Sequence, residues 1–129
     1  MANIIKGILI TPNKKGTEPK IYNFEHNSYE DFYPLLECDL FEIQNRNFNG
    51  INADIYCDEE GKFKDNNQPS IITMNNKNVV EVFVGSVFIC KHNEEGETIS
   101  LTDEECEKIL ATVKTVGLAD KKTVLVAQL

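Results

Sequence analysis

Acidic residues are the most densely clustered polar residues of this sequence. They concentrate in two glycine-flanked segments, residues 58–61 (DEEG) and 94–97 (EEGE). Paired carboxylates can do acid–base chemistry, but glycine marks both segments as turns, where solvation explains the charge. We therefore interpret these acids as candidates for contact with a partner and not as catalytic groups: Glu59, Glu60, Glu94, Glu95 and Glu97.

The four cysteines, at positions 38, 57, 90 and 106, lack the CxxC spacing of zinc and redox motifs. Cys90 and His92 are two residues apart and would share one face of a strand. Together with Cys57 they offer three potential zinc ligands. Cys57 and Cys106 also occupy apolar positions in periodic segments, where a free thiol packs as a small hydrophobe. We favour packing and expect no metal site.

Motifs for catalysis are missing from the sequence. Nucleophilic catalysis needs a base within reach of a serine or cysteine, and neither His26 nor His92 stands in such a context. The phosphate-binding patterns GxxxxGK[ST] and GxGxxG are absent, as is an EF-hand loop. We expect a protein that is not an enzyme and that uses no cofactor.

The net charge of −8 is unevenly distributed along the chain. Residues 23–60 carry ten acids and one arginine, and residues 93–107 carry seven acids and no basic residue. Nucleic-acid binding requires clustered lysine and arginine, so direct binding to DNA or RNA is disfavoured. An acidic surface instead favours a protein partner with a basic surface.

Alternating apolar residues predict the first strands that position these acids. Residues 4–11 and 19–24 are expected to form an antiparallel pair. Residues 39–46 and 51–57 are expected to form a hairpin around Asn49-Gly50, a dipeptide that readily adopts positive φ.

Residues 79–91 are apolar on both faces, which predicts one central strand covered on both sides, with either a bulge or a close approach by another backbone at Gly85. A last strand is expected over residues 123–127. We expect a core that includes Val82, Val84, Phe88 and Ile109.

Two helices are predicted from capping signals. Ser28 to Asp31 opens a short helix through about Glu37, in which Pro34 lies either in the first turn or at a bend. Residues 102–105 (TDEE) form a full capping box, and the helix that they open is expected to continue through residue 116 and to end at Gly117.

These elements predict one α+β domain over residues 1–129: an antiparallel-rich sheet with two short-to-medium helices, the helix at 102–116 packed on one face. A chain of 129 residues with 41% hydrophobic residues can bury its own core. No apolar run approaches the roughly 20 residues of a membrane span, and no signal peptide is evident. We therefore expect no membrane association and a cytoplasmic location.

Four segments between residues 55 and 105 resemble a family of phage, plasmid and other mobile-element proteins, the domain of unknown function 3846. They are residues 55–62 (IYCDEEGK), 84–89 (VGSVFI), 95–97 (EGE) and 100–105 (SLTDEE). The chain departs from the family pattern at Ser86, where threonine is expected, and at Cys38, where glycine is expected. The resemblance implies an accessory protein in a bacterial host cytosol, and it supplies no catalytic residues.

The acidic charge of the chain and its resemblance to this family together lead to one functional hypothesis. We expect a phage-type accessory protein that binds and inhibits a host factor with a basic surface, such as a defence nuclease. The alternatives are a small-ligand sponge that sequesters a nucleotide signal and a structural phage protein. A sponge needs a basic or amide-lined pocket, and a structural protein needs an oligomer; the sequence does not indicate an oligomeric state.

Overall fold

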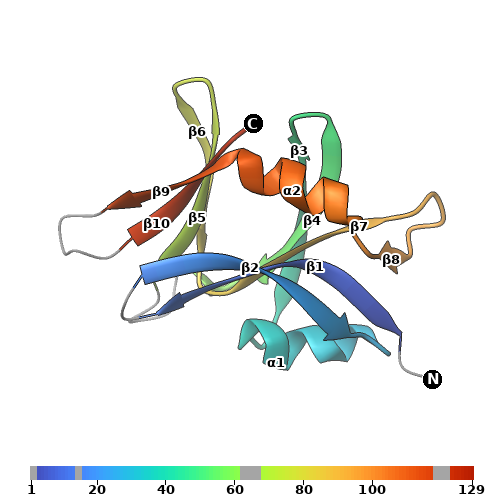
Figure 1. The fold of residues 1–129 in the computed structure, drawn as a ribbon. Coiled ribbons are helices and arrows are strands. Elements are labelled where there is room, and N and C mark those ends of the chain that lie inside the picture. The colour runs from blue at the N-terminus through green and yellow to red at the C-terminus, as the bar shows by residue number, and fades with distance from the viewer. Residues whose placement is uncertain (1–2, 14–15, 62–67, 118–122) are drawn as a thin grey trace.

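The computed structural model describes residues 3–13, 16–61, 68–117 and 123–129 (Figure 1). Strand is the dominant element, and two short α-helices and one 3-10 turn accompany it within these ranges. The elements in chain order are β1 (Ile4–Asn13), β2 (Gly16–Glu25), η1 (Tyr29–Asp31), α1 (Phe32–Leu36), β3 (Phe41–Phe48), β4 (Ile51–Asp58), β5 (Pro69–Asn75), β6 (Asn78–Val84), β7 (Val87–His92), β8 (Thr98–Ile99), α2 (Asp103–Ala111), β9 (Val113–Gly117) and β10 (Thr123–Gln128).

The strands form two sheets. The larger sheet runs β2-β1-β7-β4-β3, with β8 paired to β7, and the smaller sheet runs β6-β5-β10-β9. Every ladder is antiparallel except the one between β5 and β10. The predicted antiparallel-rich sheet with two helices is therefore present, but the protein is mostly β and divides its strands between two sheets.

Two hydrophobic cores hold the layers together. One core lies between the two sheets and α2, and it includes Ile55, Ile89, Leu125 and Ile109. The other lies between the larger sheet and α1, where the Phe32 ring stacks on Tyr56 with 4.2 Å between ring centroids. Successive residues of β4 and β7 alternate between the two cores, which is the period of two expected of a strand.

Both predicted hairpins are confirmed. β1 pairs with β2 along its whole length, although Lys14 and Lys15 of the expected loop lie outside the described residues. β3 pairs with β4 around Asn49 and Gly50, both of which have positive φ. The first helix begins at Phe32, so Pro34 lies in its first turn, where the missing N–H removes no intrahelical bond.

The expectation of one central strand over residues 79–91 is wrong. The run forms two strands, β6 at the edge of the smaller sheet and β7 inside the larger one. Gly85, with φ of 86°, changes the direction of the chain between them, and its N–H donates to the Gln68 carbonyl. Phe88 is buried as predicted, but Val82 and Val84 are only half-buried because β6 has one open edge.

The expected helix over residues 102–116 is also too long. Its capping box is confirmed, because Thr102 Oγ1 accepts from the Glu105 N–H and Glu105 Oε1 accepts from the Thr102 N–H. The helix ends at Ala111, and residues 113–117 form β9 and pair with β10. Val113, Thr115 and Val116 are β-branched and favour a strand. Gly117 therefore ends a strand and not a helix. Ile109 is buried as expected.

None of the helices in the described ranges is long and apolar enough to cross a membrane.

Substitution of Gly7 should test the packing of β1 against β7. A Cβ atom at this position would lie 2.5 Å from Phe88 Cζ and closer still to the Ile89 carbonyl oxygen. We expect Gly7→Ala to lower the free energy of unfolding by about 3 kcal/mol, the upper end of the range for overpacking, because backbone cannot yield easily. Gly117→Ala is the matched control, since no atom lies within 4 Å of its added Cβ. Equal unfolding midpoints in urea for the two variants would contradict this packing.

Acidification should weaken the start of α2. Burial acts to raise the pKa of Glu105, but hydrogen bonds from Lys91 and from the Thr102 backbone outweigh burial and hold the pKa below its usual value. The folded state thus binds this proton less readily than the unfolded state, so the stabilisation is present at neutral pH and is lost as pH falls through the lowered pKa. We expect Glu105→Gln to cost about 0.5 kcal/mol at pH 7 and nothing near pH 2. Thermal unfolding at both pH values measures this, and an equal cost at both would refute it.

Candidate functional site

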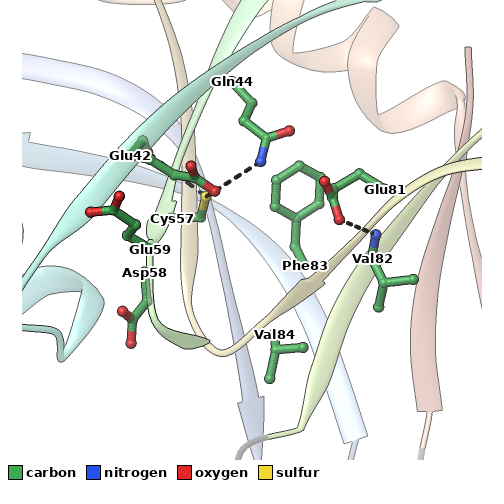
Figure 2. A pocket seen from close by; sticks show the side chains of 9 residues that line it. All are labelled: Glu42, Gln44, Cys57, Asp58, Glu59, Glu81, Val82, Phe83 and Val84. Carbon is green, nitrogen blue, oxygen red and sulfur yellow. Dashed lines mark hydrogen bonds between the residues drawn. The ribbon is translucent and has the colours of Figure 1, made fainter. Parts of the chain in front are cut away.

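An acidic cavity of about 100 Å³ opens between two edge strands, β3 of the larger sheet and β6 of the smaller sheet. Figure 2 shows Glu42, Gln44 and Cys57 on one side of it and Glu81 and Phe83 of β6 on the other. We call this cavity and its rim the acidic groove. Its lining residues are Glu42, Gln44, Cys57, Asp58, Glu59, Glu81, Val82, Phe83 and Val84.

Strand register determines which side chains reach the groove from the larger sheet. Glu42 is paired with Cys57, so both project from the same face, and Cys57 belongs to the core between the sheets. Gln44 follows Glu42 on that face because alternate residues of a strand project to the same side. Glu59 follows the end of β4, where its N–H donates to the Leu40 carbonyl and anchors the turn beside β3.

Hydrogen bonds orient the carboxylate of Glu42. Gln44 Nε2 donates to Glu42 Oε1 over 3.0 Å, and Arg46 in turn donates to the Gln44 side-chain oxygen. The Cys57 thiol lies 3.7 Å from the Glu42 carbonyl and 3.8 Å from Glu42 Oε1. The Glu42 carboxylate is thereby held at the wall of the groove.

Two more carboxylates are held by backbone N–H groups. Asp58 is buried, and its Oδ1 accepts from the Glu60 N–H over 2.9 Å. Glu81 on β6 accepts from the Val82 N–H over 3.1 Å. Asp58 is paired with Phe41 and projects to the α1 side of the sheet, so the acidic residues that border the groove are Glu42, Glu59 and Glu81. None of the described residues that line the groove is basic. Low-dielectric walls focus the resulting negative potential toward a cation.

The thiol in the groove is not a nucleophile. Burial, followed by the nearby Glu42 carboxylate, raises the pKa of Cys57 to about 12. Nucleophilic attack requires a thiolate, so a protonated Cys57 contributes packing and a weak S–H donor.

The five acids predicted from the sequence lie at two opposite ends of the larger sheet. Cys57 is paired with Val87 and Asp54 with Cys90, so the turn after His92 lies near the start of β4 while Glu59 and Glu60 follow its end. Eight residues of β4 separate the two ends, roughly 25 Å at about 3.3 Å per residue. The two turns therefore do not share one end of the sheet, and of the five acids only Glu59 lines the groove, with Glu60 beside it.

The turn at residues 93–97 has a structural explanation. Asn93 Oδ1 accepts from the N–H groups of Glu95 and Glu97, and the Asn93 N–H donates to the Glu97 carbonyl. Glu94 and Glu95 project into solvent. Figure 1 shows this turn and β8 at the right of the molecule, far from β6.

Sequence reasoning missed a polar cluster on the α1 side of the larger sheet. The buried carboxylate of Asp54 lies 2.6 Å from His92 Nδ1 and accepts from Asn45 Nδ2 over 2.9 Å. Only the strand register brings these three residues together. The zinc hypothesis fails for the same reason, because Cys57 and Cys90 belong to the cores on opposite faces of the sheet.

Comparison with known proteins gives one match. The model of a family described as a domain of unknown function, DUF3846, matches residues 5–114. This span includes both walls of the acidic groove. No curated protein and no solved structure matches the chain.

Thiol labelling should test the burial of the groove and cores. All four cysteines are free and buried, and burial raises the pKa of Cys57, Cys90 and Cys106. We expect an aromatic disulfide reagent at pH 8 to label no thiol of the native protein within minutes and four in guanidinium chloride. Rapid labelling of Cys57 in the native protein would show that the groove is more open than described.

Proposed function

The chain belongs to the DUF3846 family, and from that premise we propose that it is a binding protein that captures a basic partner protein in the acidic groove and blocks the partner's activity. One observation carries the proposal: Glu42, which hydrogen bonds hold at the wall, and the exposed Glu59 border a cavity between two edge strands whose described lining residues include no lysine or arginine. Carboxylates gathered at one surface attract a lysine or arginine of a partner protein.

Proteins that act on nucleic acids carry the basic surface that such a groove selects. We propose that the partner is a host factor of this class, such as a defence nuclease, and that the groove occupies the surface where DNA or RNA would lie. The resemblance to phage and mobile-element proteins supports this setting in a bacterial cytosol. A single domain that acts by binding needs neither a catalytic residue nor a cofactor for this role.

The groove argues against a nucleotide sponge. Phosphate groups carry negative charge, so the carboxylates of Glu42 and Glu59 beside the cavity would repel them. A basic protein surface carries positive charge, so the same carboxylates would attract it.

Charge reversal at the groove tests the proposal. Glu59→Lys with Glu60→Lys changes two exposed positions beside the groove, and Glu94→Lys with Glu95→Lys makes the same change at the opposite end of the sheet. A host protein captured from bacterial lysate is identified and purified, and its association rate with the three forms is measured. We expect the groove variant to associate about tenfold more slowly at low salt, because charges at a rim set the on-rate. The control variant should match the wild type.

The dependence of the association rate on salt concentration provides a second test. At 1 M salt the Debye length falls to about 3 Å, so the rates of the three forms should converge. Equal slowing by both variants would locate binding elsewhere, and a lysate in which no protein prefers the wild type over the groove variant would contradict the proposal outright.

A further inference from the structure

We propose that the open edge of β2 joins two copies of this chain, so that residues 21–25 pair antiparallel with the same residues of a second copy about a two-fold axis at Asn23. The larger sheets of the two copies then form one continuous sheet. Dimerisation goes beyond the proposed function and does not depend on it.

The main-chain groups of β2 alternate between β1 and the open edge. β2 borders the larger sheet, and within the described part of the chain it pairs with β1 alone. The His26 N–H donates to the Asn3 carbonyl at the start of β1, whereas the Thr17 N–H donates to Thr123 Oγ1, away from β1. The register with β1 has no shift, and the N–H and C=O groups of an antiparallel strand alternate in direction along the chain. The odd-numbered residues of β2 therefore face outward.

Three successive outward residues are available for pairing. The first outward N–H of β2 is already bound, as just described, and Pro19 has none. Ile21, Asn23 and Glu25 are exposed, and no other strand of the described chain pairs with their outward groups. A two-fold axis at Asn23 pairs Ile21 with Glu25 of the second copy and Asn23 with itself. The free segment is thus complementary to itself, as a contact between identical surfaces requires.

The side chains fit this register. Tyr22 and Phe24 project to the α1 side of the sheet, and the two-fold axis sets the second copy's Tyr22 opposite Phe24. Aromatic pairs across neighbouring strands stabilise a sheet. A hollow of about 460 Å³ lies beside this edge, and the ring of the second copy's Tyr22 enters it. Its lining residues are Tyr22, Phe24, Glu25, Asp31, Pro34 and Leu35.

Charge favours β2 as the site of self-association. The acidic groove lies between β3 and β6, so pairing through either of those edges would bring two acidic grooves together on molecules that each carry a net charge of −8. β2 and β3 are opposite borders of the larger sheet, so pairing through β2 keeps the two grooves apart. In the proposed register Glu25 faces Ile21, and Lys20 faces His26. No two acidic side chains are therefore opposed across the new pair of strands.

The edges beside the groove also carry protection that residues 21–25 lack. The Arg46 side chain donates to the Asn45 carbonyl on β3, and β6 has a bulge at Val80. Natural proteins use such features to keep open edges from pairing. β2 instead exposes 48% of Ile21 beside its outward main-chain groups. An exposed aliphatic side chain on a regular edge strand is suited to pairing with another strand.

Sedimentation equilibrium of the full chain tests the dimer. We expect a dissociation constant on the order of 10 μM, as for a small interface. Ile21→Glu should weaken association by about tenfold or more, because two pairs of glutamates then face each other in every dimer. Ile43→Glu is the matched control and should leave association unchanged. Ile43 is 47% exposed, almost the same as Ile21, and lies on β3 at the opposite border of the sheet.

A second substitution tests the register. Glu25→Lys added to Ile21→Glu sets opposite charges across the two-fold axis and should restore association to within several-fold of the wild type. The two positions lie four residues apart on one strand, roughly 13 Å, so the restoration cannot arise within one copy. Glu95→Lys added to Ile21→Glu gives the same net charge with the change in a distant turn, and it should restore nothing. Urea unfolding midpoints show that each variant is folded.

A monomer at concentrations up to about 1 mM would overturn the proposal. Equal weakening by Ile21→Glu and Ile43→Glu would also overturn it, as would failure of Glu25→Lys to restore association better than Glu95→Lys. A monomer whose Ile21 and Asn23 amides become protected from hydrogen exchange only after a captured host protein is added would show that a strand of that protein occupies the edge, which would overturn pairing with a second copy. None of these results bears on charge-driven capture in the acidic groove, which the variants at Glu59 and Glu60 test separately.

Discussion

The change of sheet at Gly85 is the constraint on which the groove depends. Its left-handed backbone divides one apolar run into β6 and β7, and the two strands then serve different sheets. The end of β6 also lies against the residue that follows β4. The approach is so close that a Cβ atom at Gly61 would lie 2.6 Å from the Val84 carbonyl oxygen. These close approaches place β6, the edge of the smaller sheet, opposite β3 and the end of β4. β6 forms one wall of the acidic groove, and β3 with the end of β4 forms the other.

The acidic groove lies beside an open strand edge, that of β6. Open strand edges invite other strands, and natural proteins protect them with charges, bulges and short lengths. β6 has a bulge at Val80 and a charged residue at Glu81, and the Glu81 carboxylate covers one outward N–H group. The groove therefore lies beside a sheet edge that these features protect from pairing with other strands.

Local signals in the sequence were sufficient for the hairpins and for both helix starts, because Asn49-Gly50 and the capping boxes depend on neighbouring residues. The change of sheet was not predictable in this way, since an apolar run on both faces describes equally a central strand and two strands of different sheets. The end of α2 was misjudged because pairing with β10 decided the conformation of residues 113–117. Of the candidate acids, which were expected to contact a partner from two turns, only Glu59 lines the cavity. The cavity itself, the separation of the two turns and the Asp54–His92 contact depend on strand register, which no local pattern reveals.

Amide proton spectra of the full chain, recorded during titration with the captured host protein, test the central claim most directly. If the acidic groove is the binding surface, the largest shifts and the greatest slowing of hydrogen exchange should occur at Val82 and Val84, with further shifts at residues 42–44 and 57–59. Residues 93–97, at the far end of the larger sheet, should change little. Shifts centred on residues 93–97, with an unchanged exchange rate at Val82, would contradict the account.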